Sequence, residues 1–249
     1  MEVHAHSHTP RKKWTHYFWE FLMLFLAVFC GFLAENFREH QVEHQREKQY
    51  MQSFIYDLQN DTANLNAGFP LKDDRVIAID SVFLFFERNP DVTKIPGKVF
   101  RHIQRTVWDR HYRRNSTTID QLKNAGGMRL IRKKNIADSI AAYDLQWVRA
   151  EFWRELYITN LEKGKGFIEK IFTANDLLPT FRNNSTGNSL AASTTDSLTI
   201  RISPGYLNEY LNFLNYQKTS TIQDKRGYQA IEQSAERLID LIKKEYHLQ

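Results

Sequence analysis

The spacing of apolar and polar residues predicts a protein that is helical along most of its length. Several long stretches repeat apolar residues at steps of three and four, the period at which side chains share one face of an α-helix. The chain has only 10 Gly and 6 Pro in 249 residues, and this shortage of chain breakers favours helices over a turn-rich β architecture. We therefore predict an all-α fold in which amphipathic helices hide their apolar stripes in a bundle.

The first apolar stretch, residues 17–34, is continuous rather than periodic. It contains one charged residue, Glu20, and as a helix it would be about 27 Å long, close to the thickness of the hydrocarbon layer of a bilayer. Three basic residues, 11–13, and several aromatic residues lie at its start, as at a membrane interface. We predict a single transmembrane helix that follows a basic, His-containing tail, residues 1–16.

Two other interpretations of this segment remain open: the core helix of a soluble protein, and a cleaved signal peptide. Cleavage after Ala34 would place Phe32 where a small residue is required, so an uncleaved anchor fits better. The basic cluster at 11–13 favours a cytoplasmic N-terminus. We therefore expect the protein in the inner (cytoplasmic) membrane, with an extracytoplasmic, periplasmic body.

One face of the predicted membrane helix carries small and polar residues: Glu20, Ala27, Gly31 and Ala34. Small residues let membrane helices approach closely, and an acidic side chain within a span turns away from lipid. This face would pack against a second copy of the chain or against a partner membrane protein. The alternative is that Glu20 reaches the interface and pairs with His16.

The rest of the chain divides into four parts by its pattern. Residues 35–65 contain no Gly or Pro and form a predicted helical stalk, and residues 66–70 (NAGFP) break that helix. Residues 66–177 form the first part of the bundle, 178–204 a polar loop, and 205–249 the C-terminal helices that complete the bundle.

Individual helices follow from the apolar periodicity. The residues from Met51 to Leu65 form a heptad-like, coiled-coil seam that requires a partner helix. Aromatic residues of the longest periodic stretch, among them Trp153, are expected in the core rather than in a binding surface. Leu198 and Ile200 alternate like a strand without an obvious partner and are left unassigned. Helices are predicted at 71–88, 98–114, 118–124, 135–173, 207–214 and 228–242.

The segment from Lys98 to Lys134 is strongly basic, with eleven Lys or Arg residues against Asp109 and Asp120, more positive than the whole chain at +5. Anionic lipid head groups or another envelope component are the natural partners outside the cytoplasm, and we do not expect nucleic acid there. The alternative is a basic face that balances acidic helices of the same bundle. The predicted basic surface comprises Arg101, Arg105, Arg110, Arg113, Arg114, Arg129, Arg132, Lys133 and Lys134.

Catalytic signatures are sparse. His40, Glu43 and His44 match H-x-x-E-H, an inverted zinc-protease motif, but they lie on a helix that is polar on nearly every side and lacks a third ligand. The single cysteine, Cys30, permits no intramolecular disulfide. We find no phosphate-binding loop, nucleophile elbow or dinucleotide-binding glycine pattern. We therefore expect no catalytic residue, no cofactor and no metal site.

Two blocks of sequence carry a resemblance: YFWEFLMLFLAVFCGFLAENFREH and TTIDQLKNAGGMRLIRKKNIADSIAAYD. With the basic, His-containing tail they resemble a large uncharacterised family of single-pass membrane proteins from Gram-negative bacteria. The resemblance implies an early Glu and later small residues in the span, an acidic exit and a helical body. It implies no activity, cofactor or catalytic residue.

Together these observations predict a non-enzymatic, membrane-anchored interaction or assembly protein of the bacterial envelope. One alternative is a ligand-sensing helical bundle that acts through a partner protein. Another is a zinc hydrolase built on His40, Glu43 and His44.

Overall fold

The computed structural model describes residues 14–110, 112–124, 126–177 and 197–248. The chain divides into two compact units, Met1–Tyr50 and Met51–Gln249, and one helix, α1 (Trp14–Arg88), contributes residues to both. The described residues are almost entirely helical, so the predicted all-α fold is confirmed. Most of the predicted tail (1–13) and most of the predicted polar loop (178–196) lie outside the described residues.

The described part of the first unit is a single stretch of α1. Its 18-residue apolar window has a mean hydropathy of 2.0, and none of the window is buried. Among the described residues, α1 is the one helix that is long and apolar enough to cross a membrane. The predicted apolar helix is therefore present, with its side chains exposed.

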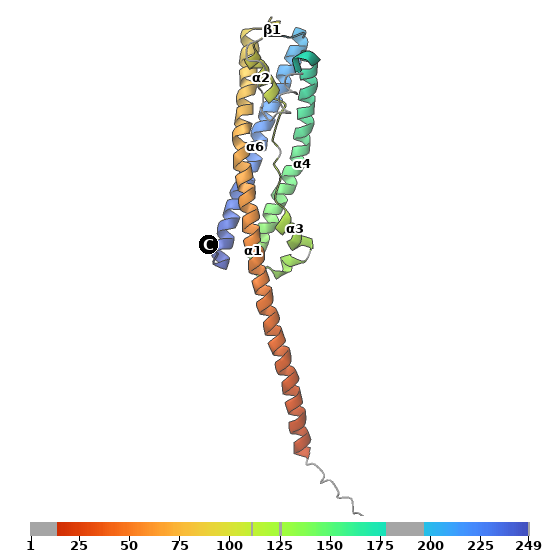
Figure 1. The fold of residues 1–249 in the computed structure, drawn as a ribbon, viewed down its shortest axis with the longest axis vertical. Helices are drawn as coiled ribbons and strands as arrows, with labels where there is room; N and C mark the ends of the chain where they lie inside the picture. The colour runs from red at the N-terminus through yellow and green to blue at the C-terminus, as the bar shows by residue number, and fades with distance from the viewer. Residues whose placement is uncertain (1–13, 111, 125, 178–196, 249) are drawn as a thin grey trace, which may run out of the picture. The chain divides into compact units, whose positions relative to one another are not determined.

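Three long helices build the second unit: α1 from Met51 onward, α4 (Lys134–Ile171) and α6 (Pro204–Tyr246). In this unit α1 and α4 run in the same direction and α6 returns beside them (Figure 1). An ion pair of 2.8 Å joins Lys133, just before α4, to Glu245 near the end of α6, as an antiparallel pair requires.

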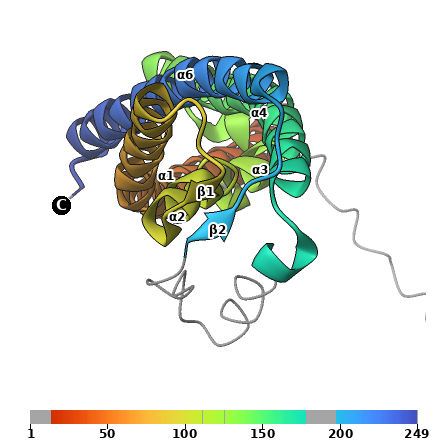
Figure 2. The same ribbon diagram turned by 90° about the horizontal axis from the view of Figure 1, so that it is seen from above.

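Short elements close the remaining side of this bundle (Figure 2). The strands pair antiparallel, with Lys94 opposite Thr199 and Ile95 opposite Leu198. The alternating residues that the sequence left unassigned thus find a partner in the loop after α1. The short elements are β1 (Lys94–Ile95), α2 (Gly97–Arg105), α3 (Thr117–Asn124), the 3-10 helix η1 (Gly127–Leu130) and β2 (Leu198–Thr199).

A polar ladder links α1 to α6 on the surface of the bundle. Its members are spaced seven residues apart on both helices. A seven-residue spacing is the sequence repeat of two helices that pack side by side along their length. The pairs are Asn66 with Glu232 at 3.1 Å, Asp73 with Lys225 at 2.6 Å and Asp80 with Lys218 at 2.6 Å.

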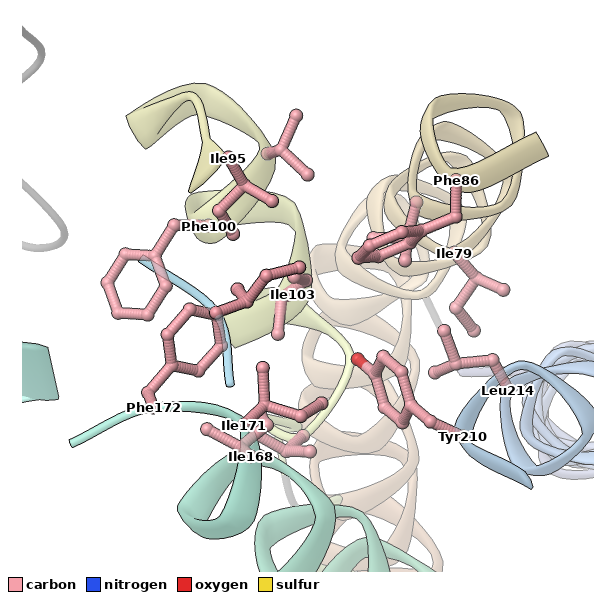
Figure 3. Close-up of a cluster of buried hydrophobic side chains, with 14 residues drawn as sticks. Ile79, Phe86, Ile95, Phe100, Ile103, Ile168, Ile171, Phe172, Tyr210 and Leu214 are labelled. Carbon is pink, nitrogen blue, oxygen red and sulfur yellow. The ribbon is translucent and has the colours of Figure 1, made fainter. Parts of the chain in front are cut away.

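The main apolar core lies at the end of the bundle near the strands, where five elements meet (Figure 3). Figure 3 shows Ile79 and Phe86 of α1 on the side of the cluster opposite Phe100 of α2. Phe100 packs edge-on against Phe172 at 4.8 Å between ring centroids. Tyr210 of α6 is fully buried in the same cluster. This core explains why the short strands and α2 fold back onto the long helices.

The predicted break at residues 66–70 is wrong, because α1 continues through Pro70. Proline removes one backbone hydrogen bond, here to the carbonyl of Asn66, and both residues are exposed, so water can reach that carbonyl. Phe69 is buried, and the backbone of Gly68 lies directly against the ring of Tyr112. Packing on both sides of Pro70 therefore outweighs its cost of about 3 kcal/mol. Residues 51–65, assigned to the stalk, belong to the second unit, and their predicted seam is buried.

The predicted helix over 98–114 is correct only as far as Arg105, where α2 ends. The chain then runs as an extended segment, because its polar groups bond to α1 instead of continuing the helix. At the far end, Asp61 accepts a hydrogen bond from the backbone N–H of Asn115 at 2.7 Å. Asp57 likewise accepts from the N–H of Thr118 at 2.9 Å, so a carboxylate of α1 caps α3.

The remaining helices lie where the sequence predicts them, but two predicted helices form one. α4 and α3 match the predictions for 135–173 and 118–124. The two stripes predicted at 207–214 and 228–242 form one helix, α6, which Ser203 caps by accepting from the N–H of Tyr206 at 3.2 Å. Trp153 is 64% exposed, so its predicted place in the core is wrong.

Substitution by alanine should have opposite effects on stability at two glycines, Gly68 and Gly227. A Cβ at Gly68 would overlap the Tyr112 ring, so Gly68→Ala should lower the free energy of unfolding by about 1–3 kcal/mol. A Cβ at Gly227, within α6, meets nothing within 4 Å, so Gly227→Ala should raise it by up to about 1 kcal/mol through helix propensity. Chemical denaturation of the purified chain, followed by circular dichroism, measures both changes. Equal effects of the two substitutions would contradict this packing.

Candidate functional site

Charged side chains interrupt the buried seam of the second unit. On α1 the inward positions continue from Leu65 and Phe69 to Lys72, Arg75 and Ile79 at steps of three and four. Lys72 and Arg75 are each 2% exposed, although such residues are almost never fully buried unless they are paired. Their burial therefore demands partners inside the bundle.

Lys72 finds two carboxylates. Its ammonium group donates to Asp109, in the extended segment after α2, and to Asp224 of α6, the latter at 2.6 Å. It also lies 4.5 Å from the ring centroid of Tyr157, so α4 supplies a cation–π contact. One ammonium group thus joins three long helices and the extended segment.

Arg75 holds the backbone of the same segment. Its guanidinium donates to the carbonyls of Thr106 and Trp108, the latter at 3.2 Å, and lies 3.7 Å from Asp109. We call Lys72, Arg75, Asp109 and Asp224 the ion cluster.

The ion cluster contains two cations and two carboxylates, so its formal charge is balanced. Burial raises the pKa of Asp224, and the attraction of Lys72 opposes that rise. Burial likewise raises the pKa of the Tyr157 hydroxyl, which keeps it neutral beside the cluster. The arrangement suits a fixed structural centre. The four side chains do not by themselves form a nucleophile beside a general base with space for a substrate.

A groove of about 710 Å³ opens beside the ion cluster, between α4 and α6. Asp224 reaches its wall, so the buried cluster and the groove share one carboxylate. The volume is in the range of small-molecule sites. We call it the α4–α6 groove; it is lined by Ala150, Trp153, Leu156, Tyr157, Asn160, Ser220, Gln223, Asp224, Arg226, Gly227 and Tyr228.

An exposed apolar stripe follows the outer face of α4 next to this groove. Its side chains are 47–64% exposed, and they recur at steps of one to four residues over three turns. Contiguous exposed apolar side chains of this kind commonly mark interaction surfaces. The stripe consists of Leu145, Val148, Phe152, Trp153 and Leu156.

The predicted basic surface is distributed along the second unit. Arg101 and Arg105 lie on α2, near the strands, whereas Arg129 lies on η1, near the start of α4. Arg114 bonds to Asp144 at 2.6 Å, and Lys133 bonds to Glu245 at 2.8 Å, so part of the positive charge is balanced within the bundle. The exposed members of the set are Arg105, Arg110, Arg113, Arg129, Arg132 and Lys134. Binding of an anionic partner by them stays a prediction.

The predicted residues of the first unit all lie on α1. Glu20, Ala27, Gly31 and Ala34 are exposed in the single chain, and a Cβ at Gly31 would meet nothing within 4 Å. This leaves room for a neighbouring helix, and packing with one stays a prediction.

The H-x-x-E-H motif forms contacts along one helix. His40 lies 4.0 Å from Glu43, and His44 lies 3.4 Å from Glu47, each a pair three residues apart. Among the described residues, no group of three or more His, Cys, Asp or Glu side chains could hold a metal ion.

The ion cluster was not predicted from the sequence, although the sequence carries a signal for it. Continuing the steps of three and four on α6 from Leu214 through Thr221 to Tyr228 passes through Asp224. The same count on α1 passes through Lys72. Opposite charges at two inward positions, Lys72 one step from Phe69 and Asp224 one step from Tyr228, would have indicated a buried pair.

Comparison with known proteins finds no matching family model, no matching curated protein and no matching solved structure. The resemblance to a family of single-pass membrane proteins therefore stays a prediction.

The ion cluster predicts a large cost for removing its central cation. Lys72→Met leaves two buried carboxylates beside one guanidinium and should lower the free energy of unfolding by about 3–5 kcal/mol. The double variant Lys72→Met, Asp224→Asn should lose less, because it removes one of the uncompensated charges. Lys218→Met breaks an exposed rung of the ladder and should cost less than about 1 kcal/mol. A similar cost for the two lysine variants would contradict the role of the cluster.

Asp144 predicts a pH-dependent contribution to stability. Burial raises the pKa of Asp144. Hydrogen bonds from Lys123 and Arg114, at 2.9 and 2.6 Å, together lower it by more, so the net shift of the pKa is downward. A carboxyl whose pKa falls on folding stabilises above its unfolded pKa of about 4, and that stabilisation is lost as pH falls through the folded pKa. Asp144→Asn should cost about 1–2 kcal/mol at pH 7 and progressively less from pH 5 to pH 3.

The exposed Asp138, on the same helix, provides the matched control. Asp138→Asn removes an exposed carboxylate and should change the free energy of unfolding at pH 7 by less than about 0.5 kcal/mol. An equal loss of stability in the two variants at pH 7 would show that Asp144 does not bind Arg114 and Lys123 in solution.

Proposed function

We propose that the protein is a non-enzymatic, membrane-anchored interaction module of the bacterial envelope. The observation that carries the proposal is the exposed apolar stretch of α1. In a soluble protein, a helix with a mean hydropathy of 2.0 over 18 residues would be covered by its own chain, and here none of that window is buried. Lipid is the environment that satisfies such a surface, and a helix of this length suits it.

The proposed topology follows the distribution of charge. The basic residues 11–13 favour a cytoplasmic N-terminus in the inner membrane, with the second unit on the periplasmic side. We also propose that Glu20, Ala27, Gly31 and Ala34 face a second copy or a partner membrane helix, since their small side chains permit close approach.

The second unit supplies the interaction surface in this proposal. The outer face of α4 exposes Phe152, Trp153 and Leu156, which a stable monomer has no structural reason to present together. The α4–α6 groove lies beside them and shares Trp153 and Leu156 with the stripe. A binding role of the bundle accounts for both features. The groove also supports the alternative of a ligand-sensing bundle that signals through a partner.

Two matched pairs of substitutions test the anchor. Phe25→Asp with Phe29→Asp should move the protein from the membrane pellet to the soluble fraction after alkaline extraction, because each Asp costs about 2.5–3.5 kcal/mol within a span. Phe152→Asp with Leu156→Asp, two positions on α4 that are at least as exposed as Phe25 and Phe29, should leave it in the pellet. Retention of the first variant, or release of the wild-type chain, would refute membrane anchoring.

The mass of the protein isolated from membranes distinguishes an anchor from a signal peptide. An intact N-terminus is expected, whereas loss of residues up to about 34 would indicate cleavage.

A further inference from the structure

One outer face of the second unit carries positive charge that no described carboxylate balances. It belongs to α2, whose apolar residues Val99, Phe100 and Ile103 are buried in the core near the strands. The side chains left on the outer side of this helix are basic, and they lie within about 100° of one another around its axis. We call them the α2 face: Lys98, Arg101, His102 and Arg105.

The charge of the α2 face stands apart from the rest of the basic segment. Residues 92–108 contain four Lys or Arg residues and no acidic residue. The Lys and Arg side chains of the face form no ion pair with a described carboxylate, whereas Arg114 and Lys133 do. Burial and the three neighbouring cations lower the pKa of His102, so the charged groups that act on this ring are all positive.

The strands beside α2 add two exposed cations (Figure 2). Lys94 lies opposite Thr199, and the antiparallel pairing continues through a hydrogen bond from the N–H of Ile200 to the carbonyl of Thr93 at 2.9 Å. Arg201 lies on the same side as Thr199, because successive side chains of a strand alternate. The positive surface therefore extends from α2 onto the strands.

The α2 face lacks an apolar centre. Interfaces between proteins bury a centre of aromatic or aliphatic side chains and surround it with a polar rim. The apolar side chains of α2 are all buried in its own bundle, so the face offers charge alone. Charge alone attracts basic segments to anionic lipid head groups, with a gain of about fivefold in affinity for each Lys or Arg. The face therefore fits an anionic lipid surface better than an acidic protein.

The α2 face lies far from the point at which α1 enters the second unit. α1 enters this unit at Met51, whereas α2 shares the apolar core with Val82 and Phe86, near the end of the same helix (Figure 1). The residues from 51 to 86 make about 50 Å of helix. The second unit therefore receives the chain from the apolar stretch at one end and carries the α2 face near the other.

We propose that the α2 face binds the surface of a second, anionic bilayer and so links it to the bilayer that holds the anchor. A few cations without apolar contacts bind weakly in one copy of the chain. Many copies anchored in one membrane contact many head groups of the other at once, and the weak contacts add up. This assignment rests on the proposed function, since it requires α1 to be anchored in lipid.

Two double substitutions remove the same charge from different places. Lys98→Gln with Arg105→Gln removes two exposed cations from the α2 face. Arg149→Gln with Arg237→Gln removes two exposed cations from α4 and α6 and is the matched control. Neither pair breaks an ion pair among the described residues, so both variants should fold, which circular dichroism checks. A third variant, Lys98→Arg with Arg105→Lys, retains the charge of the face.

The test is co-flotation of the full-length chain, held in nanodiscs of phosphatidylcholine, with separate vesicles. Vesicles that contain about one third phosphatidylglycerol should bind the chain, and vesicles of phosphatidylcholine alone should not. Lys98→Gln with Arg105→Gln should weaken the binding at least about tenfold, because each lost cation costs about fivefold. The matched control and the charge-retaining variant should change it less than about threefold. Polyglutamate, compared at the same concentration of negative charge, should bind less tightly than the anionic vesicles.

Four results would overturn the proposal: no binding of the anionic vesicles, equal binding of both vesicle types, an equal loss in the α2-face variant and the matched control, or tighter binding of polyglutamate. The last would assign the face to an acidic protein. A chain that does not enter nanodiscs, or that alkali releases from membranes, refutes the anchor. A chain that enters nanodiscs but binds no anionic vesicle refutes the link between bilayers alone, so the two failures are distinguishable.

Discussion

The second unit depends on one buried ammonium group, that of Lys72, which contacts carboxylates of α6 and of the extended segment. The surface ladder between α1 and α6 repeats every seven residues, so a shift of α6 by seven residues that brings Lys218 opposite Asp73 would still pair Asp73 with a lysine. The same shift would place Gln217 opposite Lys72 instead of Asp224. A buried cation without its carboxylate is far more costly than a lost exposed pair. The ion cluster therefore selects one register where the central rung of the ladder permits a second.

Polar groups of α1 also explain how a non-helical segment can lie within a helical bundle. Buried backbone carbonyls need donors, and Arg75 supplies them to Thr106 and Trp108. Farther along, Asp57 and Asp61 accept from the backbone N–H groups at the start of α3. The seam of α1 therefore does more than bury apolar surface. It also satisfies the backbone that links α2 to α3.

The sequence predicted what depends on local periodicity, and it failed where distant contacts decide. The steps of three and four correctly located α4 and much of α6, because a helix repeats its inward positions along its own length. Local capping residues and glycines located α3. Pro70 and Gly68 indicated a break by local rules, but Tyr112, far along the chain, packs against that backbone. The candidate site was missed for the same reason. Lys72 and Asp224 are 152 residues apart, and neither residue alone indicates its partner.

Asp224 links the stability of the bundle to the chemistry of the groove. Because Lys72 binds Oδ2, the carboxylate is held in place at the groove wall and its charge is balanced from behind. Asp224 therefore cannot change without disturbing the seam. Trp153, Asn160 and Gln223 are not part of the seam and make no hydrogen bond to a described side chain. Substitutions at these three positions should therefore cost little folding stability, whereas a substitution of Asp224 should cost much more.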